Sequence, residues 1–292
     1  MLVFKLEISM AKSALLKSSL AKKYWMALTG LFLCLFLVGH LAGNLQLIFA
    51  DALQFNEYAL FMTTNPAVKV LSYVTYFSII FHSIDGILLA VQNRKARPVR
   101  YQFEKQQANT RFASRNMAVL GTLLLVFIVT HMVNFWAPMH FDKNMPLQTI
   151  SVDGPMPGMK IECYLTNGTG LQKFIPVHLV DGKNLALEGT TFYWVKPVKV
   201  KISEGYKNLH KITVAFFKDE HYGLVFTLLY VLSMGVLGFH LHHGFASAFQ
   251  SLGFNNRKYD ILLKNVGSAF SILVPLTFAI IPVYIHFFLK AS

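Results

Sequence analysis

The sequence predicts an all-α membrane protein, a bundle of five transmembrane helices with a small β-rich external insertion between the third and the fourth. Composition is the first reason: of 292 residues, 54% are apolar and only 14% are charged, whereas a soluble domain carries about 25% charged residues. The apolar content excludes disorder, and a count of only two cysteines excludes a disulfide scaffold. The formal charge of +13 suits nucleic acid or a membrane, and the long apolar stretches favour the membrane.

Long apolar stretches are the second reason. A helix needs roughly 20 mostly apolar residues to cross a bilayer. Five stretches meet this requirement: 25–48, 68–91, 116–137, 222–247 and 266–289. The first follows a lysine-containing segment, residues 1–24, but lacks the small-residue cleavage site of a signal peptide. We therefore expect spans one to three within residues 25–137 and spans four and five within residues 222–292.

The distribution of cations predicts the orientation. Residues 94–115, between spans two and three, hold seven cations against Glu104 alone, and the segment between spans four and five also carries more cations than acids. The predicted loop from Asp51 to Ala67 has two acids and no cation. Because cationic loops stay in the cytoplasm, we expect a multi-pass membrane protein with its N-terminus in the cytoplasm and its C-terminus outside.

The segment between spans three and four, residues 138–221, is periplasmic in this topology. Its runs TFYWVKPVKVKI and HKITVAFF alternate apolar and polar residues, and the turn signals DGP, NGTG and VDGKN lie in the same segment. Alternating runs between turn signals are typical of β-hairpins. We therefore expect a small β-rich insertion here.

Histidines inside the apolar stretches indicate a function. Ionisable side chains are costly in a bilayer, and although a lone histidine often only bonds a neighbouring helix, the first four spans each hold one: His40, His82, His131 and His240. With a helical rise of about 1.5 Å per residue, His40 and His131 lie roughly 22 Å from the cytoplasmic ends of their spans. His82 and His240 lie in the inner halves of the other two spans. The depths therefore predict two layers, His40 with His131 and His82 with His240.

Two histidines that face each other in a helical bundle are the usual axial ligands of a haem iron. Zinc and copper also bind imidazole, but they prefer three or four protein ligands, and neither layer supplies such a set. The two-layer pattern therefore predicts a bundle that holds two haems.

Other residues near the histidines fit a bulky flat cofactor or plain helix packing. Small residues that leave room for either are Gly39, Gly43, Gly238 and Gly244. His243 lies near the cytoplasmic interface, where an imidazole can meet a haem propionate. Asp85 lies one turn after His82, and its alternatives are to orient a ligand, to relay protons or to bond a neighbouring helix.

Five runs resemble a known family: ALTGLFLCLFLVGHLAGNLQL, FNEYALFMTTNP, FHSIDGILLA, SRNMAVLGTLLLVFIVTHM and GFHLHHGFASAFQSLGFNNRKY. They are similar to the dihaem cytochrome b membrane anchor of succinate dehydrogenase and fumarate reductase (succinate:quinone oxidoreductase), in its Bacteroidetes-like form with a single five-span anchor. The resemblance covers nearly all of residues 1–137 and 208–292, and residues 150–207 depart from it. It implies a bacterial inner (cytoplasmic) membrane, with the C-terminus in the periplasm. It also implies that the four span histidines bind two b haems in the same two pairs. It also favours His240 over His242 and His243, because Gly244 follows His240 by four residues.

The resemblance further implies two cytoplasmic partner subunits, a flavoprotein with covalent FAD and an iron–sulfur protein. Succinate and fumarate chemistry of the tricarboxylic acid cycle would occur on those partners. The chain itself would be the enzyme subunit that transfers electrons between the iron–sulfur protein and a membrane quinone, for which the resemblance suggests menaquinone.

A quinone needs a proton donor or acceptor within hydrogen-bond distance. The loop FNEYALFMTTNP follows span one, so we expect this loop to line an outer quinone site. Glu57 is the candidate for proton transfer in this partly buried loop, and Asn44 and Gln46 are candidate hydrogen-bond donors to a quinone carbonyl. The alternatives are that Glu57 is solvated, that Asn44 and Gln46 cap the helix end, and that the quinone binds on the inner side near Ser247 and Gln250.

Two other functions are alternatives. A haem b anchor of another quinone-linked dehydrogenase, such as a hydrogenase or formate dehydrogenase, shares the two-layer pattern but not the five runs. A transporter predicts broken helices or acidic mid-membrane residues in related halves, and the sequence has no internal repeat.

Overall fold

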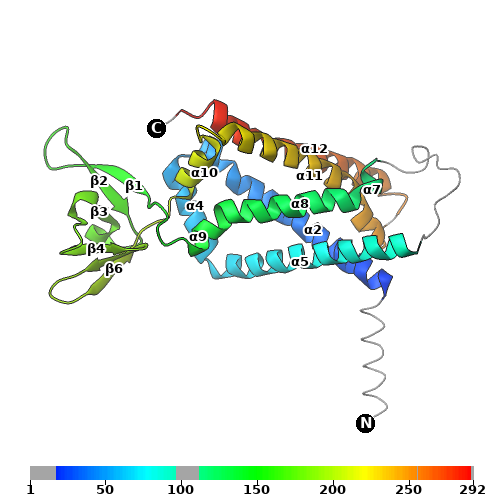
Figure 1. Ribbon diagram of the computed structural model, residues 1–292, viewed down its shortest axis with the longest axis horizontal. Coiled ribbons are helices and arrows are strands. Elements are labelled where there is room, and N and C mark those ends of the chain that lie inside the picture. The colour runs from blue at the N-terminus through cyan, green and yellow to red at the C-terminus, as the bar shows by residue number, and fades with distance from the viewer. Residues whose placement is uncertain (1–17, 97–111, 255, 291–292) are drawn as a thin grey trace, which may run out of the picture. The chain divides into compact units, whose positions relative to one another are not determined.

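The computed structural model describes residues 18–96, 112–254 and 256–290 (Figure 1). Five helices in these residues are long and apolar enough to cross a membrane: Leu20–Phe49, Pro66–Lys95, Met117–Phe141, Gly223–Ser251 and Asp260–Phe287. They confirm the predicted spans in number and order, and their ends differ from the predicted ends by at most six residues. By helix length and composition, the chain is a multi-pass membrane protein.

The spans are built from α2 (Ser19–Asn44), α3 (Gln46–Phe49), α5 (Pro66–Lys95), α8 (Met117–His131), α9 (Ala137–Phe141), α11 (Gly223–Ser251) and α12 (Asp260–Phe287), with a short helix α7 (Phe112–Arg115) before α8. A π-helical turn, Met132–Trp136, joins α8 to α9. Pro138 follows this turn and has no N–H for a regular helical bond to Asn134. The N–H of Ala137 donates to the Met132 carbonyl instead, which closes the wider turn.

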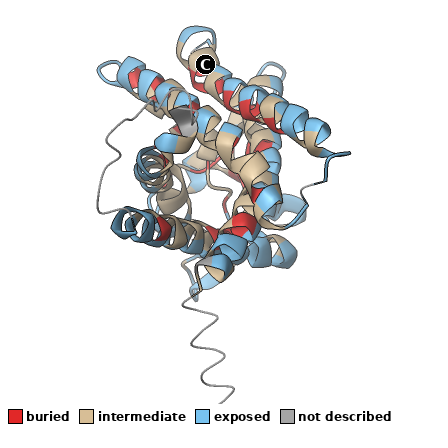
Figure 2. Ribbon diagram, turned by 90° about the vertical axis from the view of Figure 1, so that its right-hand side faces the viewer, coloured by how far each residue is buried: buried red, intermediate tan, exposed pale blue. Residues whose placement is uncertain are grey.

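The apolar faces of these helices are largely exposed. Only 11% to 33% of the most apolar window of each helix is buried, and Leu35, Val70 and Leu232 are each more than 60% exposed. Figure 2 shows exposed and intermediate segments along the helices. Soluble proteins rarely leave apolar surface of this extent in water. Burial therefore agrees with the membrane assignment that composition predicts.

The segment from Asp51 to Ala67 connects spans one and two but is not an irregular loop, because most of it is helix α4 (Ala52–Thr64). The prediction of a loop there is wrong. The Asp51 carboxylate begins the helix by accepting a hydrogen bond from the Gln54 N–H at 2.8 Å, and Asn65 ends it. The buried residues of α4 recur with helical spacing: Phe55, Asn56 and Ala59.

Between spans three and four, the chain forms two three-stranded antiparallel sheets, which lie side by side (Figure 1). The first holds β1 (Thr149–Asp153), β2 (Lys160–Leu165) and β3 (Phe174–Pro176), and the second holds β4 (Leu185–Glu188), β5 (Thr191–Trp194) and β6 (Val200–Glu204). Short 3-10 turns occupy Gly170–Lys173 and Val177–Leu179. The core consists of Leu147, Ile175, Leu185 and Phe192. The predicted β-rich character of this segment, including the hairpin from TFYWVKPVKVKI, is confirmed.

The run HKITVAFF is not a strand, and that part of the prediction is wrong. It belongs to helix α10 (Leu209–Phe217). The side chain of Asn208 caps the helix by accepting a hydrogen bond from the Lys211 N–H at 2.8 Å. Thr213 and Phe217, four residues apart, are buried on one face, so helical spacing prevails over the apparent alternation.

Lys207 ties the base of the insertion to α9. Its Nζ donates to the carbonyl oxygens of Met139 at 2.6 Å and Asp142 at 3.0 Å. These carbonyls lie at the C-terminal end of α9, where a cation is favourable. Burial lowers the pKa of Lys207, although the Asp142 carboxylate opposes that shift.

The chain divides into two compact units. The first comprises residues up to Ala42 together with Val70–Ile128 and Leu228–Ile280. The second comprises Gly43–Lys69, Val129–Thr227 and the residues from Ile281 onward. Three of the predicted ligands, His40, His82 and His240, belong to the first unit, and His131 belongs to the second.

Candidate functional site

His82 of α5 and His240 of α11 lie against each other in the first unit. Their ring centroids are 6.1 Å apart, and the ring planes cross at 69°. The two residues are 158 positions apart in the sequence, and depth in the bilayer predicts them as a pair. The structure brings this predicted pair together.

The spacing of the two rings suits a metal ion between them. A bond from a metal to an imidazole nitrogen is about 2 Å long, so an iron bound by two imidazoles holds the ring centroids roughly 6 Å apart. A direct hydrogen bond between ring nitrogens is about 2.9 Å long and would hold the centroids roughly 5 Å apart. The observed 6.1 Å is compatible with the metal-bridged spacing, and it is also an ordinary spacing for two rings in edge contact.

The first helix holds one nitrogen of His82. Nδ1 of His82 lies 3.1 Å from the Met26 carbonyl oxygen and 3.4 Å from the Thr29 hydroxyl. Because a carbonyl oxygen only accepts, Nδ1 carries the proton and donates it. The lone pair of Nε2 is then available to a metal, the arrangement that ligating histidines adopt.

Two glycines allow the neighbouring helices to approach the rings. A Cβ atom on Gly30 of α2 would lie 3.1 Å from Cε1 of His82 and 3.5 Å from its Nδ1. A Cβ atom on Gly121 of α8 would lie 3.7 Å from Cε1 of His240. Four helices, α2, α5, α8 and α11, therefore surround the pair.

His240 has an unsatisfied polar atom. Its Nδ1 is buried and has no hydrogen-bond partner among the described residues. Such a group is costly in an apolar interior. Within the described ranges, no group of three or more His, Cys, Asp or Glu side chains is arranged to hold a metal ion. The donor set is therefore two imidazoles, which fits the axial positions of a haem.

The other predicted pair is divided between the two units. His40 of α2 stacks on Phe36, with ring centroids 5.2 Å apart and planes at 16°, and its ring centroid lies 5.8 Å from that of Phe278 of α12. His131 is the last residue of α8, directly before the π-helical turn, and its ring centroid lies 5.4 Å from that of Phe135. Such turns are frequent at functional sites. The pairing of His40 with His131 stays a prediction.

The remaining histidines of α11 have hydroxyl neighbours. Nε2 of His243 lies 3.4 Å from the Ser247 hydroxyl, and Nδ1 of His242 lies 3.4 Å from the Ser271 hydroxyl of α12. Asp85 is half-buried. No described contact assigns His243 to a propionate, so that role stays a prediction.

The four glycines that the sequence singles out have two different surroundings. A Cβ atom on Gly43 would overlap the ring of Tyr58 in α4, and one on Gly238 would lie 3.1 Å from the Ser271 carbonyl oxygen. These two glycines serve close packing. No described atom lies within 4 Å of a Cβ atom on Gly39 or Gly244, so of the four glycines only these two adjoin open space.

The candidate quinone residues lie in the second unit. Asn44 is the last residue of α2, and Gln46 is the first of α3, where its carbonyl accepts the Ala50 N–H. Glu57 lies on α4 and is exposed, not partly buried as predicted. The reason is its place on the helix, opposite the buried face around Phe55 and Asn56.

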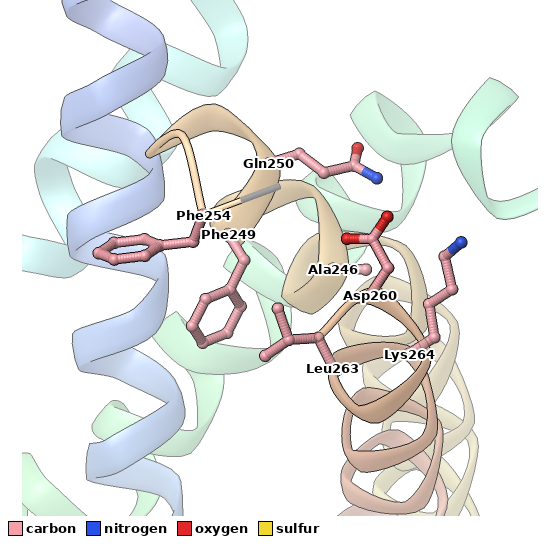
Figure 3. A pocket seen from close by; sticks show the side chains of 7 residues that line it. All are labelled: Ala246, Phe249, Gln250, Phe254, Asp260, Leu263 and Lys264. Carbon is pink, nitrogen blue, oxygen red and sulfur yellow. The ribbon is translucent and has the colours of Figure 1, made fainter. Parts of the chain in front are cut away.

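The inner alternative has a small pocket beside it. Residues at the end of α11 and the start of α12 line the pocket: Ala246, Phe249, Gln250, Phe254, Asp260, Leu263 and Lys264. Figure 3 shows Gln250, Asp260 and Lys264 on one side of it and the rings of Phe249 and Phe254 on the other. Its volume is about 230 Å³, including space open to solvent, and pockets that bury drug-sized ligands have roughly 300–1,000 Å³. The volume of this pocket therefore lies below that range.

The sequence did not predict the contacts that α2 makes with His82. The adjacent pair Thr29–Gly30 is visible in the sequence as a polar and a small residue in an apolar span. Its position relative to His82 depends on the rotation of α2, which periodicity does not give.

Comparisons with known proteins found no match: no family model, no curated protein and no solved structure is similar to this chain. The five apolar helices characterise the chain as a multi-pass membrane protein, and within it His82 and His240 lie against each other.

Proposed function

We propose that this chain is the dihaem cytochrome b anchor of a succinate:quinone oxidoreductase, transferring electrons between an iron–sulfur partner subunit and a membrane quinone. The observation that carries the proposal is the spacing of His82 and His240, whose ring centroids are 6.1 Å apart inside a span bundle. The hydrogen bond from His82 Nδ1 to the Met26 carbonyl supports it further. The resemblance of the five runs to the family supports the identity of the partners.

The residues contribute ligation, exclusion of water and docking. When bound, a haem accepts and donates single electrons. The imidazoles would hold the iron, and the apolar helices would lower the dielectric constant around it. Described cations next to the predicted cytoplasmic loops are exposed and suit docking of partner subunits: Arg94, Lys95, Arg115, Arg257, Lys258 and Lys264. Others that belong to this predicted surface, Arg97, Arg100, Lys105 and Arg111, lie outside the described residues, as do the predicted cytoplasmic lysines Lys5, Lys12 and Lys17.

A reduced-minus-oxidised spectrum of the purified protein tests the proposal. We expect the bands of bis-imidazole b haem, with about two haems per chain. Mass spectrometry of the co-purifying subunits tests the proposed partners, and we expect a flavoprotein and an iron–sulfur protein. A protein without haem would contradict the proposal. A hydrogenase or formate dehydrogenase subunit among the partners would instead identify the chain as the haem b anchor of that other dehydrogenase.

The predicted orientation can be tested directly at the turn before β4 in the insertion. Lys183 is exposed beside Asn184 in a turn that the Asp181 carboxylate stabilises. Lys183→Cys should react with a membrane-impermeant thiol reagent in intact spheroplasts. The native protein is the control, because Cys163 is buried and Cys34 lies in span one. Labelling only in inverted vesicles would reverse the topology.

The outer quinone site is tested by Glu57→Gln, which keeps the shape of the side chain and removes its proton-carrying group. We expect both haems to be retained while electron transfer to and from quinone falls by roughly 100-fold or more, the scale of a lost general acid–base group. Gln54→Ala, at another exposed position of α4, is the matched control. Unchanged quinone turnover in Glu57→Gln would favour the inner side near Ser247 and Gln250.

A further inference from the structure

The two imidazoles of the inner pair have different surroundings. Nδ1 of His82 has two oxygen neighbours on α2, the Met26 carbonyl at 3.1 Å and the Thr29 hydroxyl at 3.4 Å. Nδ1 of His240 is buried without a partner among the described residues. Any control that hydrogen bonding exerts on this pair therefore acts through His82.

The Thr29 hydroxyl acts as an acceptor toward His82. Its single hydrogen is directed to the Trp25 carbonyl oxygen at 2.7 Å and the Met26 carbonyl oxygen at 3.2 Å. The lone pairs of the Thr29 oxygen therefore remain available to accept the N–H of His82 Nδ1. Thr29 is only 5% exposed, so water does not compete for this position.

Gly30 supplies the space for the contact. A Cβ atom there would lie 3.1 Å from Cε1 and 3.5 Å from Nδ1 of His82. The first distance is tighter than normal packing, so an alanine would displace the ring by a few tenths of an ångström. Because the Met26 carbonyl also belongs to α2, we expect a ring displaced from Gly30 to lie farther from that carbonyl as well.

We infer that α2 sets the proton position and the ligand strength of His82: the Met26 carbonyl and the Thr29 hydroxyl hold the proton on Nδ1, and Gly30 leaves the space for the ring to reach them. Thr29 and Gly30 are thus positioning residues. A hydrogen bond from the distal nitrogen makes an imidazole a stronger donor to a metal. A stronger donor stabilises the oxidised iron, so this contact lowers the reduction potential of the inner haem. The part of the inference that concerns iron rests on the proposed function, and the part that concerns the proton does not.

The first experiment needs no haem. NMR of the haem-free full chain, labelled at histidine, distinguishes a proton on Nδ1 from one on Nε2, and the His82 signal is assigned by its loss in His82→Ala. We expect the proton on Nδ1 in the native chain and an increased Nε2–H population in Gly30→Ala. An Nε2–H tautomer in the native chain would overturn the inference, whether or not the protein binds haem.

The second experiment is a redox titration of the haem-loaded protein. In Gly30→Ala, the reduced-to-oxidised ratio of the inner haem at its native midpoint should rise roughly two- to tenfold, the scale of one hydrogen bond. Thr29→Val should raise the same reduced-to-oxidised ratio by a smaller factor, and Thr29→Ser should return the ratio to its native value.

Matched controls separate this effect from general packing. Thr122→Val removes a hydroxyl that donates to the Ala118 carbonyl in the same way, at an exposed position of α8. Gly235→Ala adds a methyl group where no described atom lies within 4 Å. If Gly30→Ala and Thr29→Val titrate like these two controls, the inference is overturned while the proposed function stands. A chain that binds no haem contradicts the proposed function, and the tautomer experiment still decides the inference.

Discussion

His82→Ala and His240→Ala are each expected to lose one haem, the same one in both variants. Each substitution removes one of two imidazoles whose ring centroids are 6.1 Å apart. A haem held by a single axial bond is held weakly, so the haem content should fall from about two to about one per chain. Haem extraction measures the content, and the reduced spectrum identifies which haem is lost.

The neighbouring histidines of α11 provide the controls. His242→Ala and His243→Ala remove imidazoles that contact Ser271 and Ser247, and both variants should keep two haems. Loss of a haem in His243→Ala, together with full content in His240→Ala, would exchange the roles of these two residues. Full content in His82→Ala would contradict the inner pair altogether.

The outer pair extends the same prediction. His40→Ala and His131→Ala should each lose the other haem and leave the inner one spectrally unchanged. If one of the two variants lost the inner haem instead, the two-layer arrangement would be wrong, because depth in the span assigns His40 and His131 to one layer.

The pairing of His82 with His240 could be predicted because helical rise converts sequence position into depth. Two residues at equal depth in one bundle meet if both point inward, and ionisable residues in a bilayer do point inward. Rotation about the helix axis is different. Nothing in an almost uniformly apolar span reveals that Thr29 and Gly30 face His82, so that contact needed the structure.

The errors lie in short amphipathic segments near the span ends. In α10, Ile212, Val214 and Phe216 alternate as a strand would, whereas the Asn208 cap and the burial of Phe217 belong to a helix. Such short runs satisfy both patterns, and packing against α4 decides between them. For α4, the N-cap at Asp51 is a local signal that the sequence does contain.

A buried amide network joins α4 to the base of the insertion. The amide nitrogen of Asn56 donates to the side-chain oxygens of Gln148 at 2.5 Å and Asn208 at 2.9 Å. The amide oxygen of Asn56 accepts the His210 N–H at 3.0 Å. Asn56 is only 1% exposed. The network thus connects the helix that carries Glu57 to both chain segments that enter and leave the sheets.

Asn56→Ala is expected to open this junction. It leaves the Gln148 carbonyl oxygen and the His210 N–H buried without their partner, and each such group costs about 1–3 kcal/mol. A total of about 3 kcal/mol raises the population of the locally open form by roughly 100-fold. Trypsin cleavage after Lys207 and Lys211, which are held in structure here, should accelerate by a similar factor in detergent.

Asn56→Asp separates hydrogen bonding from the loss of volume. It keeps the size of the side chain but directs a carboxylate at the acceptor oxygens of Gln148 and Asn208, so cleavage should accelerate at least as much as in Asn56→Ala. Gln54→Ala, at an exposed position of α4, should be cleaved at the native rate. If all three variants were cleaved equally fast, the amide network would not be what holds α4 to the insertion. If only Asn56→Ala were cleaved faster, packing volume would be the cause.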